Sequence, residues 1–246
     1  LGLLAIGGGA VATASLVTLP GCSPTMVKRS TNSSLDEELS ADIVIAGGGL
    51  GGFAAAMASL RNNQTVILTE ETDWIGGQLT QQGVPPDEHQ WIETHGAPQL
   101  YRDFRNGVRD YYKRNYPVIP EAKQDPIFNP GNGVVSRLCH EPRVALEIMQ
   151  SMIAPYLSNG KLKLLLNHKI YSASVTDDIV KSVSATDLQT GNVKVLTAPH
   201  FVDATEMGDL LPITGTEFVT GTESKKETQE LHAPEVGDPK SNQAFT

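Results

Sequence analysis

The chain has 246 residues, of which 39% are hydrophobic and 19% are charged, and its formal net charge is −9. This length can build one sizeable hydrophobic core or two small ones. An acidic chain without a basic face has nothing to neutralise a phosphate backbone, so we exclude nucleic acid as a partner. The six histidines show no metal-ligand spacing, so we expect no metal site.

The first residues have the composition of an export signal. Residues 1–19 are continuously small or apolar, and they end in Leu19-Pro20-Gly21-Cys22. This pattern predicts a secretory signal with a bacterial lipobox over residues 1–22 and a lipid on Cys22. The alternative is a single membrane anchor, because nineteen residues just reach the spanning length. In both cases we expect an exported, membrane-associated protein on the periplasmic or cell-surface side.

A polar segment follows the signal. Residues 23–40 read SPTMVKRSTNSSLDEELS, which predicts a tether between the membrane and the folded domain. With Cys22 carrying a lipid, Cys139 is the one cysteine left, and we expect no intramolecular disulfide.

The stretch ADIVIAGGGLGG at residues 41–52 is the strongest motif of the chain. An apolar run, Asp42–Ala46, leads directly into a glycine cluster in which Gly47, Gly49 and Gly52 fit the pattern G-x-G-x-x-G. In a dinucleotide-binding βαβ unit these glycines provide a tight turn, close approach of the backbone to a pyrophosphate and close helix–strand packing. The predicted helix over residues 51–62 would point its free N–H groups at the phosphates.

A second apolar strand, Thr65–Glu70, ends in an acid twenty-three positions after Gly47. An acidic side chain at this point can accept hydrogen bonds from the hydroxyl groups of the adenosine ribose, and it disfavours a 2′-phosphate. The alternative is an ordinary glycine turn of another α/β protein, with Glu70 a solvated strand end. Strand, glycines, helix, strand and acid occur in order, which favours the nucleotide site.

Two further motifs distinguish FAD from a nicotinamide cofactor. Gly76-Gly77-Gln78-Leu79-Thr80 comes soon after Glu70, and Asp203-Ala204-Thr205-Glu206-Met207-Gly208-Asp209 comes far downstream. At these residues the chain resembles the FAD-dependent oxidoreductases of the glutathione-reductase-like superfamily, over roughly residues 41–215. One departure is Glu206, which stands where the A-T-G form of the second motif has glycine.

The resemblance implies an α/β fold: a Rossmann-like FAD-binding domain with a parallel central sheet, a β-meander and a helical or irregular insertion. It implies FAD as the cofactor, with a G-G-x-L-T-like loop passing the flavin and the backbone near Ile170 contacting adenine. The expected cofactor-binding residues are Gly47, Gly49, Leu50, Gly51, Gly52, Glu70, Gly76, Gly77, Gln78, Thr80, Ile170, Ala204, Thr205 and Asp209.

The insertion spans about residues 81–141. Its apolar residues recur at helical spacing over residues 98–114, which predicts an amphipathic helix. The other face of this helix carries Arg102, Arg105, Arg109, Lys113 and Arg114, either as a solvated face or as an anion site for substrate. Residues 116–135 are rich in Pro, Gly and Asn and predict irregular structure, and residues 141–157 predict a helix that Pro155 kinks or ends.

Strand patterns follow from residue 161 onward. We expect strands at residues 164–166, 170–175, 179–185, 193–197 and 200–204, separated by turn residues. In the resembled superfamily this region supplies the third parallel strand, a β-meander and the strand that returns to the central sheet.

These observations predict a membrane-tethered FAD enzyme that transfers hydride between an organic small molecule and the flavin, with an unidentified electron acceptor. Candidates for the group that takes the substrate proton are His89, Glu93, His95 and His140. Cys139 is either a small packed residue or a thiol near the flavin. Two alternatives stay open: an NAD(P)-dependent dehydrogenase, and a lipoprotein that binds a nucleotide without catalysis.

The chain ends soon after the second motif. In the resembled superfamily the polypeptide continues into a substrate-binding region and then returns to cover the flavin. We therefore expect residues 216–246 to be the start of a substrate domain that is cut short, and the sequence to be a fragment of the enzyme.

Overall fold

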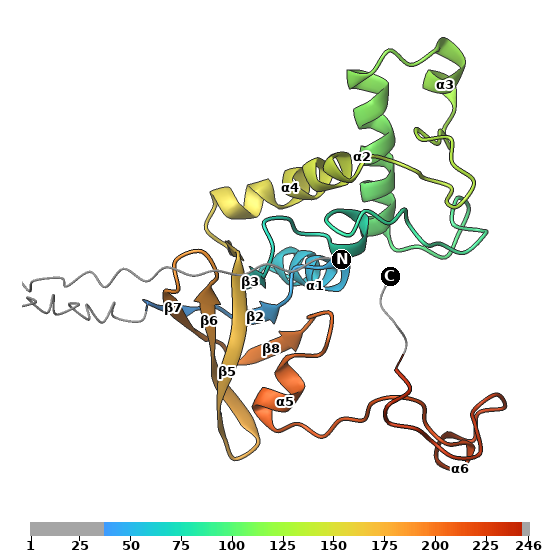
Figure 1. Ribbon diagram of the computed structural model, residues 1–246. Helices are drawn as coiled ribbons and strands as arrows, with labels where there is room; N and C mark the ends of the chain where they lie inside the picture. The colour runs from blue at the N-terminus through green and yellow to red at the C-terminus, as the bar shows by residue number, and fades with distance from the viewer. Residues whose placement is uncertain (1–36, 243–246) are drawn as a thin grey trace, which may run out of the picture. The chain divides into compact units, whose positions relative to one another are not determined.

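The computed structural model describes residues 37–242 (Figure 1). The predicted signal segment 1–22, with Cys22, and residues 23–36 of the predicted tether lie outside the described residues. In the part of the chain that is described, no helix has the length and apolar character needed to cross a bilayer.

A four-stranded parallel sheet forms the centre of the domain, in the order β4-β3-β2-β8. Strands β2 (Ile43–Ala46) and β3 (Val66–Glu70) are the two predicted apolar runs, and they pair in register from Ile43 with Val66. Strands β4 (Leu162–Leu166) and β8 (His200–Asp203) extend the sheet on either side. Apolar runs of this kind suit a parallel sheet that is covered on both faces. The expected Rossmann-like α/β fold with a parallel sheet is confirmed.

Helix α1 (Leu50–Arg61) connects β2 to β3 and packs on the parallel sheet. Its buried residues include Phe53, Met57 and Leu60, which belong to the same apolar cluster as Ile45 and Leu68 of the strands. Small residues fill most of the remaining positions of the helix, so its axis can approach the sheet closely. This packing fixes the turn between β2 and α1 at the carboxyl edge of the sheet.

The second sheet contains the predicted β-meander, in the order β1-β7-β6-β5. Strand β6 (Ile179–Asp187) lies between β5 (His168–Thr176) and β7 (Val193–Thr197) and pairs antiparallel with both. Buried residues of this sheet form a second apolar cluster with Val44, Ala46 and Ile67 of the parallel sheet.

Strand β1 (Glu37–Ser40) corrects the expected tether, because its residues were assigned to the polar segment 23–40. It pairs parallel with β7, and Leu39 lies opposite Leu196 and packs against the second cluster. The prediction was wrong here because a four-residue edge strand with one inward apolar side chain carries almost no periodic signal. The folded domain therefore begins no later than Glu37.

The insertion contains a short 3-10 helix, η1 (Gly77–Leu79), and the helices α2 (Gln99–Asn115), α3 (Pro120–Gln124) and α4 (Pro142–Ser158). Helices α2 and α4 pack against each other. Helix α3 lies in the stretch predicted to be irregular, and it begins with a proline at a position where the missing N–H costs nothing. Pro155 does not end α4, which continues to Ser158.

Two short helices follow the sheets. Helix α5 (Leu210–Thr214) packs against β5, and helix α6 (Lys225–Thr228) begins with a capping box formed by Ser224 and Glu227. An isolated antiparallel bridge joins Thr222 to Asp238. Residues 216–242, which include α6 and this bridge, are the described part of the segment that was expected to start a further domain.

Candidate cofactor site

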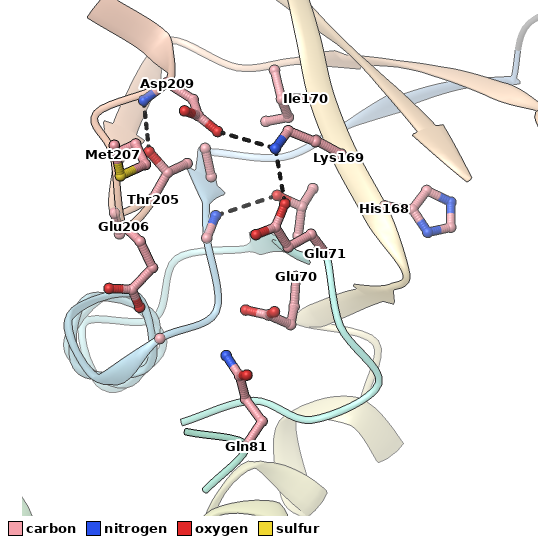
Figure 2. Close-up of a pocket in the computed structure, with 15 residues that line it drawn as sticks. Glu70, Glu71, Gln81, His168, Lys169, Ile170, Thr205, Glu206, Met207 and Asp209 are labelled. Carbon is pink, nitrogen blue, oxygen red and sulfur yellow. Dashed lines mark hydrogen bonds and ion pairs between the residues drawn. The ribbon is translucent and has the colours of Figure 1, made fainter. Parts of the chain in front are cut away.

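A pocket lies at the carboxyl ends of β2, β3 and β8, beside the start of β5 (Figure 2). This edge is where open α/β sheets bind their ligands. Seven of the residues expected to bind the cofactor line the pocket: Gly47, Gly49, Glu70, Ile170, Ala204, Thr205 and Asp209.

The glycine turn after β2 needs its glycines for steric reasons. Gly47 has a φ of +92°, and a Cβ atom built on it would lie 2.3 Å from the carbonyl oxygen of Ala204. A Cβ atom on Gly52 would lie 1.9 Å from the carbonyl oxygen of Gly47. Side chains at these two positions would push the turn away from β8 and from α1.

Gly49 differs from these two glycines because the space beside it is open. Apart from the chain neighbours of Gly49, the described residues place only one atom within 4 Å of a Cβ atom built on it, Oε1 of Glu206 at 3.1 Å. No backbone closes this space, so a phosphate group can approach the turn here. This geometry fits the expected close approach of the protein backbone at Gly49 to the pyrophosphate.

The N-terminus of α1 supports the same position for an anion. Gly49 is the N-cap residue, no side chain caps the helix, and the first turn contains no acidic residue. The first N–H groups of an α-helix have no partner within the helix, and the helix dipole makes this end positive. A pyrophosphate would satisfy both the hydrogen-bond donors and the charge.

Glu70 is buried at the end of β3 and is held by three hydrogen bonds. Its Oε2 accepts from the backbone N–H of Gly48 at 2.9 Å. Its Oε1 accepts from the backbone N–H of Thr72 at 2.9 Å and from the Thr72 hydroxyl at 2.8 Å. Since each carboxylate oxygen has two lone pairs, the group can still accept hydrogen bonds from a ribose.

The loop Gly76–Thr80 packs against the glycine turn instead of lining the pocket. The backbone N–H of Gly76 donates to the carbonyl oxygen of Gly48 at 2.8 Å, and a Cβ atom built on Gly77 would lie 3.1 Å from Cα of Gly49. The Thr80 hydroxyl donates to the carbonyl oxygen of Ile75 at 2.7 Å and so closes the loop. The expected residues that do not line the pocket are Leu50, Gly51, Gly52, Gly76, Gly77, Gln78 and Thr80.

The turn after β8 is stabilised by its own side chains. Asp203 accepts hydrogen bonds from the Thr205 hydroxyl at 2.7 Å and from the backbone N–H of Leu210 at 2.9 Å. The Thr205 hydroxyl in turn accepts from the backbone N–H of Asp209 at 2.7 Å. The motif DATEMGD therefore forms a compact turn whose Ala204 and Thr205 face the glycine turn.

Several residues that line this pocket were not among the expected cofactor-binding residues, among them Glu71 and Lys169. The ammonium group of Lys169 lies 3.0 Å from Glu71 and 3.7 Å from Asp209, so it joins β5, the end of β3 and the turn before α5 (Figure 2). The hydrogen bond to Glu71 raises the pKa of Lys169. The sequence offers one signal for these two residues, because each is adjacent to an expected cofactor-binding residue: Lys169 precedes Ile170, and Glu71 follows Glu70.

His168 also contributes to the pocket wall, but its ring lies on the other side of β5 from Lys169 (Figure 2). Its Nδ1 lies 2.7 Å from the carbonyl oxygen of Leu166. Because a carbonyl oxygen only accepts, Nδ1 carries the proton in this contact.

The proposed acid–base candidates do not line the pocket. His89 and His95 are exposed and lie around the ring of Trp91, with ring centroids 6.1 and 6.0 Å from it. His140 is half-buried beside Phe104, and this burial lowers its pKa. The structure therefore does not bring these candidates together at the cofactor pocket.

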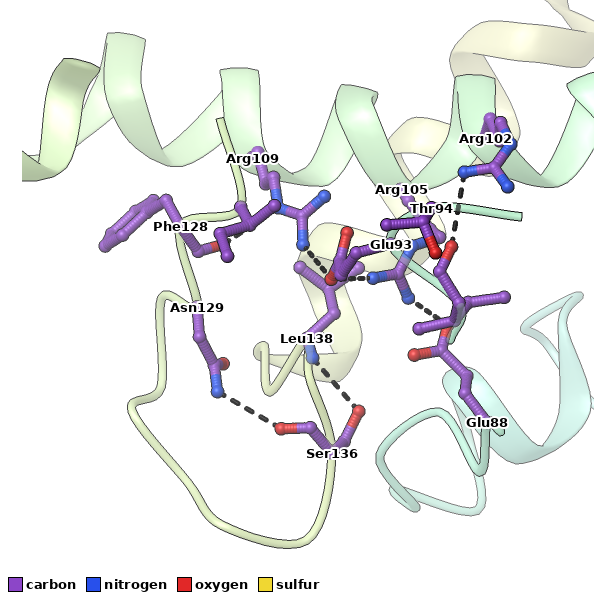
Figure 3. Close-up of polar contacts among 12 residues, drawn as sticks. Glu88, Glu93, Thr94, Arg102, Arg105, Arg109, Phe128, Asn129, Ser136 and Leu138 are labelled. Atoms are coloured by element: carbon purple, nitrogen blue, oxygen red, sulfur yellow. Dashed lines mark hydrogen bonds and ion pairs between the residues drawn. The ribbon is translucent and has the colours of Figure 1, made fainter. Parts of the chain in front are cut away.

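The fourth candidate, Glu93, belongs to an ion-pair network beneath α2 (Figure 3). Glu93 pairs with Arg105 and, at 2.7 Å, with Arg109, while Arg105 also pairs with Glu88. Arg105 is 1% exposed and Arg109 is 3% exposed. The expectation of a solvated basic face is wrong for these two arginines, because acids from the loop before α2 neutralise them.

Cys139 is a buried thiol within the insertion. A Cβ atom built on Gly133 would lie 2.6 Å from its sulfur, and the thiol contacts the carbonyl oxygen of Ser136 at 3.7 Å. These contacts describe a small packed side chain.

Residues 42–244 match the sequence profile of a family described as FAD dependent oxidoreductase. The chain belongs to this family. FAD is therefore its cofactor, and the open space at Gly49 together with the uncapped N-terminus of α1 fits the diphosphate of FAD.

Solved structures similar to this FAD-dependent oxidoreductase chain include L-proline dehydrogenase from P. horikoshii, at 16% identity and a TM-score of 0.37, covering 69% of this chain and 23% of that one. Glycerol-3-phosphate dehydrogenase from Bacillus halodurans complexed with FAD gives 16% identity and a TM-score of 0.45, covering 71% and 36%. 3-Ketosteroid-Δ4-(5α)-dehydrogenase from Rhodococcus jostii RHA1 gives 14% identity and a TM-score of 0.40, and the match covers 71% of this chain and 47% of that one. The chain thus spans between about a quarter and a half of the length of these three proteins.

Proposed function

We propose that this chain holds the ADP half of FAD in the pocket at the carboxyl ends of β2, β3 and β8, and that the protein transfers hydride between an organic small molecule and the flavin. One observation carries the proposal. Gly48 is fixed on both sides, by Glu70 and by Gly76, while the adjacent Gly49 faces open space at the N-terminus of α1.

The residues of the pocket have distinct roles in this proposal. The N–H groups at the start of α1 bind the diphosphate, and Glu70 accepts hydrogen bonds from the ribose hydroxyls. The backbone of Ile170, in strand β5, contacts adenine. The turn at Ala204 and Thr205 supports the glycine turn from the side of β8.

The loop Gly76–Thr80 leads the chain from the nucleotide pocket toward the flavin. Its hydrogen bond to Gly48 supports this role, because it ties the loop to the diphosphate turn. When bound, FAD supplies the redox chemistry of its isoalloxazine ring, while the protein supplies position, electrostatics and exclusion of water.

The proposal includes export and attachment to a membrane. Its support is the sequence Leu19-Pro20-Gly21-Cys22 after a small and apolar segment, which is typical of a lipoprotein signal. In this view a lipid on Cys22 holds the enzyme at the membrane surface, where it meets its substrate and an electron acceptor.

The experiment that tests the function is purification of the natural full-length protein from a bacterial host, followed by absorption spectroscopy and extraction of the cofactor. We expect a yellow protein that releases FAD, in about one equivalent per chain. Release of FMN alone, of NAD alone, or of no nucleotide would contradict the proposed site.

A further inference from the structure

Glu206 places a carboxylate at the open side of the glycine turn (Figure 2). The residue occupies the position where the A-T-G form of the motif has glycine, and it lines the cofactor pocket. Its Oε1 lies 3.1 Å from a Cβ atom built on Gly49 and 3.2 Å from one built on Gly77. The carboxylate therefore lies between the glycine turn after β2 and the loop Gly76–Thr80.

This position is electrostatically favourable for any anion. The N-terminus of α1 has neither a side-chain cap nor an acidic residue in its first turn, so its positive end is open to the charge of Glu206. The diphosphate of FAD needs the same end of the helix, and it carries the same sign of charge. Glu206 and the diphosphate thus compete for one position.

A hydrogen bond holds Glu206 in this place. Gln82 donates from Nε2 to Oε1 of Glu206 at 3.2 Å, and the backbone N–H of Gln82 donates to the carbonyl oxygen of Gly77 at 3.2 Å. The Glu206 side chain thereby links the turn after β8 to the start of the insertion.

Glu206 and Glu70 are held very differently, although both line the pocket. Glu70 is buried and accepts three hydrogen bonds, so its position is fixed. Glu206 is exposed and, among the described residues, accepts one hydrogen bond, from the exposed Gln82. A rotation about its side-chain bonds can therefore move the Glu206 carboxylate into solvent at the loss of a single contact.

We propose that Glu206 sets the affinity for FAD by holding the diphosphate position until the cofactor enters. FAD binding rotates the carboxylate out and breaks its bond to Gln82, and the negative charge that stays nearby weakens the complex. The inference rests on the proposed position of the diphosphate at Gly49.

The test compares dissociation constants of the full-length protein after its cofactor has been removed, with FAD, ADP and adenosine as probes. For Glu206→Gln we expect FAD and ADP to bind about tenfold more tightly at low salt, because one negative charge near the phosphates is removed. The gain in affinity should be smaller at high salt, because salt screens this repulsion. Adenosine, which has no phosphate, should bind to both proteins equally.

Two further variants make the test specific. Glu147→Gln removes one negative charge from an exposed position of α4 and should leave all three affinities unchanged. Gln82→Ala removes the donor that holds Glu206 and should tighten FAD binding by a smaller factor. This second effect should vanish in the background of Glu206→Gln, because coupled residues are not additive.

Weaker FAD binding by Glu206→Gln would show that the carboxylate helps to bind the cofactor. Equal FAD binding would show that the carboxylate does not affect the affinity. Either result would overturn the inference but would not contradict the proposed cofactor site. If adenosine also bound more tightly to Glu206→Gln, by the same factor as FAD and ADP, the effect would not depend on the phosphates, and this result would also overturn the inference. If neither protein bound FAD or ADP, both the site and the inference would be wrong.

Discussion

The backbone N–H of Gly48 donates a hydrogen bond of 2.9 Å to Oε2 of Glu70, so the last residue of β3 holds the turn that follows β2. The other carboxylate oxygen holds the backbone of Thr72. One buried acid thus fixes the glycine turn and the segment that leaves β3, before any cofactor contributes.

Replacing Glu70 with glutamine should therefore destabilise the protein even without FAD. The amide presents one oxygen and one NH2 group where two oxygens now accept, so either the buried N–H of Gly48 or the part-buried N–H of Thr72 is left without a partner. We expect the free energy of unfolding to fall by about 1–3 kcal/mol, measured by urea denaturation of cofactor-free protein.

The matched control for this variant is Glu71→Gln. Glu71 is the next residue, and its exposed carboxylate pairs with Lys169. A surface ion pair of this kind contributes less than about 1 kcal/mol. Equal losses in the two variants would contradict the role assigned to the Glu70–Gly48 bond.

The network beneath α2 predicts a larger loss for Arg105→Met. This change leaves the Glu88 carboxylate, whose side chain is 4% exposed, without a cation, and it removes one of the two arginines that contact Glu93. Breaking a buried ion pair on one side costs about 3–5 kcal/mol, and urea denaturation would measure it.

Two variants separate the charge effect from lost packing. Arg105→Met combined with Glu88→Gln should recover part of the loss, since it removes the uncompensated charge. Arg114→Met, on the exposed end of the same helix, should change stability by less than about 1 kcal/mol. No recovery in the double variant would show that the ion pair is not the cause.

The pKa of His140 predicts how stability depends on pH. Burial lowers this pKa below the ordinary value of 6.5, so at pH values between the two constants the unfolded chain binds more protons than the folded one. The contribution of His140 to stability is therefore complete above pH 6.5 and is lost as the pH falls below it.

The variant His140→Asn tests this contribution. An asparagine amide can replace the Nδ1 contact to the carbonyl oxygen of Glu141 without titrating. We expect the free energy of unfolding of the variant to fall less than that of the wild type between pH 6.5 and 5. NMR titration of the ring in the native protein should give a pKa below 6.5; a value at or above 6.5 would contradict the structure.

The sequence predicted the parallel sheet and the glycine turn because their signals are local. The strands β2 and β3 are short apolar runs, and the glycines and Glu70 stand at fixed distances from them. Ala204, Thr205 and Asp209 were found for the same reason, since the motif DATEMGD occupies consecutive positions.

The missed features depend on contacts between distant segments. Strand β1 pairs with β7, which lies far along the chain and places Lys194 opposite Glu37. The residues of β1 themselves carry no strand pattern. The burial of Arg105 and Arg109 follows from Glu88 and Glu93 in an irregular loop. Helical periodicity alone places such arginines on a solvated face.

The proposed lipid on Cys22 makes a separate prediction about the location of the protein in the cell. When the natural full-length gene is expressed in bacteria grown with labelled fatty acid, label should appear on the wild-type protein in the membrane fraction. Cys22→Ser should remain an unlabelled, uncleaved precursor, because the acceptor thiol is gone. Absence of label from the wild type would instead support a membrane-spanning N-terminal anchor.

The position of FAD is tested most directly by measuring the retained flavin in Gly49→Val of the full-length protein, with Gly51→Ala as the control. A branched side chain at Gly49 fills the space where the diphosphate approaches, whereas the described part of the chain offers a Cβ atom on Gly51 no contact within 4 Å beyond its own helix. We predict that Gly49→Val unfolds cooperatively in urea but retains no FAD, and that Gly51→Ala retains as much FAD as the wild type. Wild-type FAD content in Gly49→Val would contradict the proposed site.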